Sequence, residues 1–514
     1  MATLILRTLF YTSCSVACGL SLVPCWAAEY YVSPIGNDTA SGTLLEPFAS
    51  VDRAQQAATA GDTIWIRGGV YEFSGTTESV GILFDKSGQA GSPIQYFAYP
   101  GETPVFDFYQ LQTAARIKGF SVTASWIHMK GLEVRGVQQI LTNVNESWGI
   151  RLENGASNNV FEQLNLHHNE GPGFFIADGG NNLVINSDSH HNYDPDRGGE
   201  NADGFGSHSN DDGNTFIGNR AWYNSDDGFD LINSPGIAYI EDSWAFLNGF
   251  VPDTQMAAGN GAGFKAGGFG LDPSRFPTEI PRHRIFGNLA FQNRVQGFYS
   301  NHHPGGIDWL NNTAVNNARN FDMLADVGEA DHYLRNNLAY GTGGGISRET
   351  TNEIDDAHNS WNLQNAPTSS DFLSTSAVGV DGPRQADGSL PFLDFMRLAP
   401  GSRLIDAGED VGLDYAGSAP DLGAFEFGLV GDYNGNGTVD AADYTIWKDS
   451  FGSVDNLRAD GNENGVVDAA DYTIWKDNFG LSIVEVHTVP EPHWWAILCA
   501  VASAAGPATR RKNQ

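Results

Sequence analysis

Three carboxylates stand within five residues of one short stretch, NSDDGFDLI at residues 224–232. They are Asp226, Asp227 and Asp230, and the residues around them otherwise have the pattern of a β-strand. Carboxylates this close repel one another, so the group must be solvated, neutralised by a cation, or used in chemistry. The cluster alone does not separate these possibilities, and the neighbouring sequence has to do so.

A repeat surrounds this stretch. Segments of the form Asn/Ser-x-Ala-x-x-Asn end at Asn224, Asn248, Asn293 and Asn317, at intervals of 24, 45 and 24 residues, and looser members end at Asn169 and Asn192. A period near 24 residues with short β-type runs and Gly or Asn turns is typical of a solenoid, and the spacing of leucine-rich repeats is absent. We therefore predict an all-β fold over residues 28–428, a parallel β-helix whose Asn side chains stack at one bend.

A phenylalanine recurs after each of these Asn residues and fixes the register between coils. The repeated positions are Phe174, Phe205, Phe229, Phe264, Phe298 and Phe321, which we expect to stack inward as one core column. Strand alternation then turns the flanking side chains outward, and adjacent coils lie about 4.8 Å apart. This register predicts that Asp203 lies beside Asp227, and that Lys265 lies beside Asp230. The four carboxylates at 203, 226, 227 and 230 should therefore converge with one lysine.

Oxygen-rich side chains on a rigid face suit Ca²⁺, which takes six to eight oxygen ligands, better than Mg²⁺ with its stricter geometry. The cluster has no cysteine or paired histidine, which argues against zinc. Desolvation and a metal charge disfavour the ammonium form of Lys265, so its amine can act as a base. The neighbouring carboxylates oppose this, and activity should favour alkaline conditions. Hydrolysis would instead need an acid/base pair of carboxylates.

The chemistry that matches a metal-bound carboxylate and an amine base is β-elimination of a uronate polymer. Arg197, His208, Arg294 and Tyr299 flank the predicted cleft and are candidates for holding uronates. Two simpler interpretations stay open: the Asp group is a structural calcium site or a solvated turn, and Lys265 is a surface ion-pair lysine. Adjacent histidines occur at 167–168, 190–191 and 302–303. Neighbours in a strand point to opposite faces, so we expect each pair to be a poor metal site made of bend or surface residues.

Three motifs resemble the family 9 pectate lyases: NADGF (201–205), NSDDGFDL (224–231) and GFKAGG (263–268). The opening YYVSPIGNDTASGT and the segment PDLGAFE (420–426) extend the resemblance to about residues 29–427. It implies a right-handed parallel β-helix, with Asp203, Asp226, Asp227 and Asp230 as ligands of one catalytic Ca²⁺ and Lys265 as the Brønsted base. The sequence departs from the family at Gly206, Ser207 and His208, where a lysine is expected. The sequence therefore does not decide whether the subsites bind pectate or rhamnogalacturonan.

A net charge of −34 argues against nucleic acid or an anionic membrane as a partner. It would also repel an acidic polysaccharide unless bound cations bridge the two. Three functions are therefore compared: a calcium-dependent lyase that cleaves polygalacturonate to 4,5-unsaturated uronate ends, a lyase of rhamnogalacturonan or another uronate polymer, and a non-catalytic β-helical adhesin or glycan-binding protein. The adhesin leaves an aligned Lys265 unexplained. We expect a monomer.

Both ends of the chain have the character of targeting segments. Residues 1–27 predict a secretory signal peptide, with an apolar run after Arg7 and small residues near Ala27. The four cysteines, at 14, 18, 25 and 499, lie in the two ends, so the mature body would have none. Residues 489–514, VPEPHWWAILCAVASAAGPATRRKNQ, resemble a PEP-CTERM-type sorting signal, which implies processing at a bacterial cell envelope. A plain C-terminal anchor is the alternative. The predicted location is secreted or attached to the envelope.

Residues 431–482 contain two copies of D-x-N-x-N-G-x-x-D-x-x-D, starting 28 residues apart. Each copy predicts half an EF-hand, a calcium loop followed by one helix. The pair resembles a type I dockerin, which implies two calcium ions and a cohesin-like or envelope partner. A calcium-stabilised spacer is the alternative. The predicted ligand positions are Asp432, Asn434, Asn436, Thr438, Asp440 and Asp443 in the first copy, and Asp460, Asn462, Asn464, Val466, Asp468 and Asp471 in the second.

Overall fold

The computed structural model describes residues 27–140, 147–324, 331–347 and 354–481, except for 386–387, 392, 400, 414, 416–417, 429–430, 435–437, 455, 457 and 462–465. The predicted signal peptide up to residue 26, all four cysteines and the segment 489–514 lie outside the described residues. So do the predicted calcium ligands Asn436, Asn462 and Asn464. Among the described residues, no helix has the length and apolar character needed to cross a membrane.

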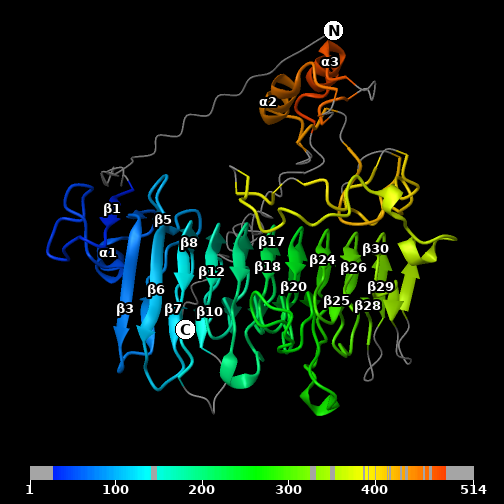
Figure 1. The fold of residues 1–514 in the computed structure, drawn as a ribbon. Helices are drawn as coiled ribbons and strands as arrows, with labels where there is room; N and C mark the ends of the chain where they lie inside the picture. Colours follow the sequence, from blue (N-terminus) through cyan, green and yellow to red (C-terminus); the bar gives the residue numbers. More distant parts are fainter. Residues whose placement is uncertain are drawn as a thin grey trace, which may run out of the picture.

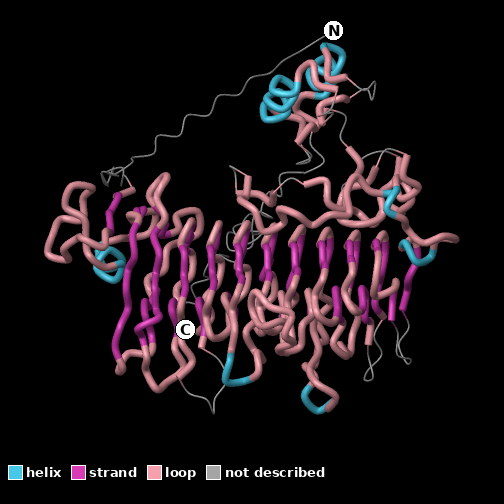
Figure 2. The backbone as a smooth tube through the Cα atoms, viewed as in Figure 1, coloured by secondary structure: helices cyan, strands magenta, loops and turns pink. Residues whose placement is uncertain are grey.

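The main body is a β-helix of three parallel sheets, in which successive coils each add one strand to a sheet (Figures 1 and 2). The first sheet has 12 strands and the other two have 10 each. In order, the first sheet contains β1 (Glu29–Val32), β2 (Thr63–Ile66), β5 (Ile94–Ala98), β8 (Ile127–Lys130), β11 (Val160–Glu162), β14 (Leu183–Ile185), β17 (Asn214–Ile217), β20 (Ala238–Glu241), β23 (Arg284–Phe286), β26 (Asp308–Leu310), β29 (His332–Arg335) and β32 (Ile354–Ala357).

The second sheet carries the predicted site, and we call it the site sheet. It contains β4 (Val80–Phe84), β7 (Lys118–Val122), β10 (Trp148–Leu152), β13 (Phe174–Ile176), β16 (Phe205–Ser207), β19 (Phe229–Asp230), β22 (Phe264–Lys265), β25 (Gln296–Tyr299), β28 (Arg319–Asp322) and β31 (Ile346–Ser347). The third sheet contains β3 (Gly69–Gly75), β6 (Pro104–Leu111), β9 (Glu133–Arg135), β12 (Asn165–His167), β15 (Asp188–His190), β18 (Arg220–Trp222), β21 (Trp244–Phe246), β24 (Leu289–Phe291), β27 (Thr313–Val315) and β30 (Leu338–Tyr340).

The described helices are short and few beside these sheets. Helix α1 packs Val51 and Ala54 into the core near the first coils, and Ser50 caps it by accepting a hydrogen bond from the Arg53 amide. The others are α2 and α3 near the C-terminus and four 3₁₀ turns. Their bounds are α1 (Val51–Ala57), η1 (Pro195–Arg197), η2 (Pro273–Arg275), η3 (Ser360–Asn362), η4 (Ser369–Asp371), α2 (Ala441–Ser450) and α3 (Ala469–Asn478).

The predicted phenylalanine column forms on the inner side of the site sheet. The rings of Phe229 and Phe264 stack with centroids 4.8 Å apart, and Phe264 and Phe298 stack at 4.9 Å. Strand pairing places Phe174, Phe205 and Phe229 in one row, as the sequence predicted. The six successive coils from β13 to β28 therefore bury an aromatic ring in the same place, which fixes the register of their outward-facing side chains.

The predicted asparagine ladder forms at one bend. The Asn224 side chain donates to Oδ1 of Asn248 at 3.1 Å, and Asn248 donates to Asn293 at 2.9 Å. The interval of 45 residues between the last two is thus one coil with an insertion rather than two coils. Two further ladders were not predicted, one through Asn159, Asn182 and Asn214 and one through Asn288, Asn312, Asn337 and Asn359. These side chains satisfy buried backbone amides at the bends.

The expectation that adjacent histidines point to opposite faces is wrong for two of the three pairs. His168 and His191 adopt left-handed backbone conformations, both with φ of 55°. Each directly follows the last residue of a strand, so the chain bends where alternation would otherwise continue. As a result the Nδ1 atoms lie 2.7 Å apart in the pair of His167 and His168, and 2.8 Å apart in the next pair.

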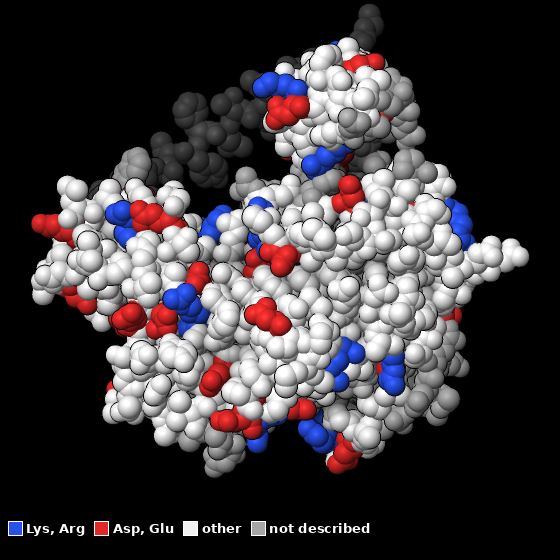
Figure 3. Space-filling model, in the orientation of Figure 1, with Lys and Arg blue, Asp and Glu red and all other residues white. Residues whose placement is uncertain are grey.

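Between Leu363 and Phe427 the chain packs apolar residues against the outer face of the third sheet. Its apolar residues form a second hydrophobic cluster with that sheet, in which Phe395 contacts Phe291 with ring centroids 5.0 Å apart. At one edge of this cover, Arg384 and Arg220 both pair with Asp188. On the face shown in Figure 3, basic and acidic side chains are interspersed, and no broad basic patch appears there.

The two C-terminal helices are related by the sequence repeat and bind one another reciprocally. The indole of Trp447 on α2 donates to the carbonyl of Asp468, and that of Trp475 on α3 donates to the carbonyl of Asp440, both at 2.7 Å. Asp440 and Asp468 are also the N-caps of the two helices. The repeat thus folds as one small helical unit with its own core of Tyr433, Ala459 and Val467.

Buried neutral histidines make the β-helix sensitive to acid. Burial, foremost, lowers the pKa of His332 to about 3, whereas an unfolded histidine titrates near about 6.5. The stability that depends on neutral His332 is therefore present above about pH 6.5 and is lost as the pH falls toward about 3. Nδ1 of His332 accepts the Ile307 amide hydrogen, as Oδ1 of Asn214 accepts the Asn182 amide on the same row.

His332→Asn keeps this acceptor and removes the titrating group. We expect the apparent melting temperature to drop less in this variant than in the natural protein between about pH 7 and pH 4.5, within the range where an unfolded histidine protonates. Differential scanning calorimetry at the two pH values measures it. An equal drop in both proteins would contradict this origin of the acid sensitivity.

Candidate functional site

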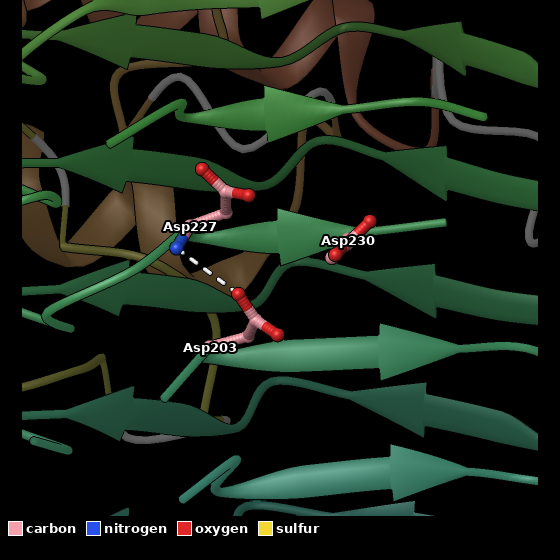
Figure 4. Close-up of side chains that lie close together, drawn as sticks. All are labelled: Asp203, Asp227 and Asp230. Atoms are coloured by element: carbon pink, nitrogen blue, oxygen red, sulfur yellow. Dashed lines mark hydrogen bonds between the residues drawn. The ribbon is translucent and has the colours of Figure 1, made fainter. Parts of the chain in front are cut away.

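The candidate site lies on three neighbouring strands of the site sheet, β16, β19 and β22. Phe205, Phe229 and Phe264 occupy one inner row, and the pairing aligns Asp230 directly with Lys265. Asp203 and Asp227 each stand two residues before the phenylalanine of their strand, in the turn before the strand begins, so strand alternation does not set the direction of their side chains. Figure 4 shows Asp203, Asp227 and Asp230 close together.

The carboxylates of Asp203, Asp227 and Asp230 offer oxygens that all lie within 4.8 Å of one another, and all three residues are buried. Lys265 completes the group, and its Nζ lies 3.0 Å from Oδ2 of Asp230 and 3.1 Å from Oδ2 of Asp227. We call these four residues the acidic cluster. The register predicted from the phenylalanine spacing therefore brings together three of the four predicted carboxylates and the lysine.

Asp226 lies beside the acidic cluster but is not one of the three converging carboxylates. Its two oxygens accept backbone hydrogen bonds from Asn201 at 2.8 Å and from Asn260 at 2.5 Å. The negative charge of Asp226 still acts on the other carboxylates, since it contributes to the raised pKa of both Asp203 and Asp227. Backbone amides thus orient Asp226 and lower the cost of its burial.

Backbone amides also orient the converging carboxylates. Oδ1 of Asp203 accepts the Asp227 amide hydrogen at 3.0 Å (Figure 4), and Oδ1 of Asp227 accepts that of Ala262 at 2.6 Å. Oδ2 of Asp227 is buried and accepts no hydrogen bond from the described residues, although the Lys265 ammonium is close. One oxygen of each of these two carboxylates is therefore fixed by the chain.

The charges in the acidic cluster are not balanced by the protein alone. Burial, foremost, and the charges of Asp226 and Asp230 raise the pKa of Asp227 to about 7, although Lys265 opposes this. Burial and the other three aspartates raise the pKa of Asp203 well above its ordinary value. Burial by itself would lower the pKa of Lys265, but the surrounding carboxylates outweigh it and raise that pKa well above the ordinary value. Without another cation, the lysine is an ammonium ion and not a base.

The residues fit a hard divalent cation. Calcium takes carboxylate oxygens at about 2.3–2.6 Å with flexible geometry, and here three buried carboxylates converge, one of them with an oxygen that accepts no hydrogen bond. A divalent charge among them would favour their ionised forms and reduce their hold on the lysine proton. Asp203, Asp227 and Asp230 would provide ligands, with Asp226 next to them.

The four predicted substrate-binding residues have different surroundings. His208 lies against the Phe175 ring at 4.7 Å, and burial lowers its pKa. Tyr299 is aligned with Lys265 on the next coil, and burial raises its pKa to about 12. Arg197 ends the turn η1, which leads toward β16. Arg294 is turned to the backbone, since its Nη2 donates to the carbonyls of Gly259 and Asn260.

Two contributors to the site were not predicted from the sequence. The first is the inserted loop at residues 249–262, which Arg294 holds and which supplies the Asn260 and Ala262 amides to the aspartates. No repeat pattern could show it, because it occurs in one coil only. The second is Arg151, which stands in the same outer row as Phe175, Gly206 and Asp230. Extending the predicted register by one coil beyond Phe174 would have found it.

Arg151 lies over the Trp148 ring at 4.0 Å and near Phe175 at 5.3 Å, and it pairs with Glu153. Between Phe175 and Asp230 the row holds Gly206, one of the positions that departs from the expected pattern. A side chain there would meet the Phe175 ring at 2.9 Å, so glycine leaves room for the ring. The outer face beside the acidic cluster is therefore aromatic and basic on one side.

Comparison with known proteins gives consistent results. Residues 30–337 match the family model described as Pel9A-like, right handed beta helix region. Pectate lyase L of Dickeya dadantii is 38% identical over 406 residues, which cover 77% of this chain and 90% of that protein. Among solved structures, a rhamnogalacturonan lyase has a TM-score of 0.68 at 36% identity, covering 73% of this chain and 97% of its own. Pectate lyase Pel9A has a TM-score of 0.67 at 36% identity, covering 78% and 96%.

Asp227→Asn tests whether ionised carboxylates destabilise the cation-free protein. Folding raises the pKa of Asp227 from about 4 to about 7, so the folded protein favours the protonated carboxyl. In chelator, this contribution to the free energy of unfolding is fully present below about pH 4 and is lost as the pH rises toward 7. We expect the melting temperature of the natural protein in chelator to fall from about pH 5 to pH 8, across the titration of Asp227, and to fall less in Asp227→Asn.

Added Ca²⁺ should then raise the melting temperature at the higher pH more in the natural protein than in Asp227→Asn. Asp308→Asn is the matched control, since Asp308 pairs with Arg282 on the first sheet and should leave the response unchanged. Equal pH dependence in Asp227→Asn and the natural protein would contradict the electrostatic account.

Proposed function

Since the chain belongs to the Pel9A-like right-handed β-helix family, we propose that it is a calcium-dependent polysaccharide lyase that cleaves polygalacturonate by β-elimination. Its relatives named pectate lyases span most of its length, which makes it an enzyme of the polysaccharide lyase class. One observation carries the proposal beyond this relationship. It is the contact of Lys265 Nζ with two buried carboxylates that the β-helix register holds on one face.

The proposed reaction uses Lys265 as the base. Its neutral amine takes the proton from C5 of a uronate, and the C–H electron pair becomes the double bond between C4 and C5. The bond from C4 to the glycosidic oxygen then breaks, and this oxygen leaves with its half of the polymer and gains a proton. Bound calcium would supply charge that withdraws electrons from the uronate carboxylate and so acidifies the C5 hydrogen.

The geometry fits this better than hydrolysis. Hydrolytic carboxylate pairs stand about 5–5.5 Å apart when one acts as nucleophile, or about 6.5–9.5 Å apart when water must fit between them. Here three carboxylates converge instead of forming a separated pair, with one oxygen of each within 4.8 Å of the others, and Asp227 and Asp230 both contact the same lysine. Carboxylates in this arrangement are better suited to be ligands of one cation than to act as a general acid and a separate base.

Rhamnogalacturonan, or another uronate polymer, is the second candidate substrate. Similarity to the rhamnogalacturonan lyase structure is as high as that to Pel9A, so it favours neither. A preference for one polymer must come from how the sugars next to the cleaved bond bind along the outer row of Arg151, Phe175 and Gly206. A non-catalytic adhesin is the third candidate, and it gives no reason for a buried lysine within a carboxylate group.

Release of unsaturated uronate, followed by ultraviolet absorbance on polygalacturonate and on rhamnogalacturonan, tests the activity. We expect polygalacturonate to give the higher kcat/KM, with a rate that is lost in chelator and rises toward alkaline pH, because the carboxylates raise the Lys265 pKa. Lys265→Ala should lower kcat by about 10²–10⁴-fold, the usual contribution of a general base.

Lys130→Ala is the matched control, since Lys130 pairs with Glu162 on the first sheet and should keep full activity. Higher activity on rhamnogalacturonan would show that this polymer is the preferred substrate, and it would leave the proposed mechanism unchanged. Full activity of Lys265→Ala, or no unsaturated product from any uronate polymer, would contradict the mechanism.

We also propose that residues 431–482 are a dockerin-like module that binds two calcium ions and docks the enzyme on a cohesin-like or envelope partner. Its support is the duplicated loop motif and the reciprocal packing of the two helices. Asp443 accepts the amide hydrogens of Asn434 and Asp440, so one carboxylate ties the loop of the first copy to its helix. With residues 1–27 as a signal peptide and 489–514 as a sorting segment, we propose a secreted or envelope-attached bacterial protein.

Asp443→Asn combined with Asp471→Asn tests the module. We expect Ca²⁺ to protect residues 431–481 of the natural chain from limited proteolysis and not to protect them in the double variant, because a ligand is lost from each loop. Mass spectrometry of the fragments locates the cuts. Equal protection of both chains would contradict calcium binding by these loops.

A further inference from the structure

Four histidines meet on the outer side of the third sheet, away from the acidic cluster. His167 and His190 are the last residues of β12 and β15, which pair in parallel, and His168 and His191 follow them. The rings of His167 and His190 stack with centroids 5.0 Å apart, and those of His168 and His191 at 5.3 Å. Within each coil the Nδ1 atoms face each other at 2.7 and 2.8 Å. We call this the imidazole cluster.

The hydrogen bonds of the other ring nitrogens fix the tautomers. Nε2 of His167 lies 3.1 Å from Oε1 of Glu133, and Nε2 of His191 lies 3.2 Å from Oδ1 of Asp253. A carboxylate only accepts, so Nε2 carries the hydrogen in both rings. Nε2 of His190 lies 3.0 Å from Oδ1 of Asn165, whose side chain also hydrogen-bonds the Glu133 carboxylate. The Asn165 amide nitrogen therefore faces Glu133, and its oxygen faces His190.

In the coil of β15, this arrangement leaves the Nδ1 lone pairs of His190 and His191 facing each other. With Nε2 protonated in both His190 and His191, a ring in its neutral form has no hydrogen on Nδ1. Their Nδ1 atoms nevertheless lie 2.8 Å apart, so two neutral rings would face each other with lone pairs at hydrogen-bond distance. Two lone pairs at this distance repel one another unless a positive charge sits between them or beside both. A proton on one Nδ1 or a metal cation bound to both would remove this repulsion.

We propose that His190 and His191 bind a divalent d-block cation such as Cu²⁺, Ni²⁺ or Zn²⁺ through their two Nδ1 atoms, with His167 and His168 offering a like pair one coil away. Imidazole nitrogen suits these metals, whereas Ca²⁺ prefers oxygen. Two ligands at right angles with bonds of about 2.0–2.1 Å stand about 2.9 Å apart, close to the 2.8 Å found here. Water fills the other positions, since the His191 side chain is 15% exposed and that of Asp253 is 78% exposed.

The surroundings match those of known histidine metal sites. A ligating histidine usually donates its other N–H to a carboxylate or carbonyl oxygen, which orients the ring and raises its basicity. His191 has Asp253 in that place, His167 has Glu133, and His190 has the Asn165 amide oxygen.

Asp253 also connects the imidazole cluster to the rest of the molecule. It lies in the inserted loop at 249–262, whose Asn260 amide binds Asp226. A metal that orients His191 would therefore hold one end of a loop whose other end reaches the acidic cluster. The binding itself does not depend on the proposed lyase activity, and the two can fail separately.

Titration of the untagged full-length protein with Cu²⁺ in excess Ca²⁺ tests the proposal, because Ca²⁺ occupies the oxygen sites. We expect saturable binding by isothermal calorimetry, and nitrogen hyperfine coupling from imidazole in the electron paramagnetic resonance spectrum. His191→Ala should weaken binding at least about tenfold, and Asp253→Ala by about 10–100-fold, as for loss of an outer hydrogen-bond partner. Asp253 is exposed, so its removal should not disturb folding.

His358→Ala is the matched control, because His358 is a partly exposed histidine elsewhere that pairs with Glu409. It should bind Cu²⁺ as the natural protein does. The proposal would be overturned by a spectrum with oxygen ligands only, by binding that His191→Ala and Asp253→Ala leave unchanged, or by no saturable binding. The last result would mean that the two lone pairs share a proton instead.

Discussion

The stacking of one phenylalanine in each of the six coils from β13 to β28 is the constraint on which the site depends. Phe205, Phe229 and Phe264 must lie one above another to fill the core, and the neighbouring rings stack at 5.1 and 4.8 Å. A shift of one residue in any of these strands would turn every outward side chain inward. Core packing thus determines which polar side chains lie next to one another on the outer surface. The contact between Asp227 and Lys265 is a consequence of burying the phenylalanines.

That meeting creates an electrostatic conflict that the protein does not resolve by itself. The register gathers four aspartates around one lysine, so burial raises the pKa of Asp203 and Asp227 while the carboxylates raise that of Lys265. Asp203 and Asp227 resist ionisation and the amine resists deprotonation. A divalent cation would change both, because its charge lowers the pKa of the carboxyls and, by neutralising them, lowers the pKa of Lys265. The same feature underlies the proposed need for calcium and the expected preference for alkaline conditions.

The sequence was informative where it repeats and uninformative where it does not. The period revealed the Asn ladder, the Phe column and the convergence of Asp203, Asp227, Asp230 and Lys265. It could not show that Asp226 turns to backbone amides, because Asn260 lies in a loop present in one coil. It also misled at the paired histidines, because the left-handed bends of His168 and His191 break strand alternation. Predictions that rest on residues 1–26, on 482–514 or on residues 435–437 and 462–465 of the calcium loops stay predictions.

The central claim is that this face performs elimination and not hydrolysis. Digestion of polygalacturonate in water labelled with heavy oxygen, followed by mass spectrometry of the fragments, separates the two directly. Elimination breaks the bond from C4 to oxygen without adding water, so the account predicts fragments with unsaturated ends and no label from cleavage. Saturated fragments that carry heavy oxygen at the new end would contradict it.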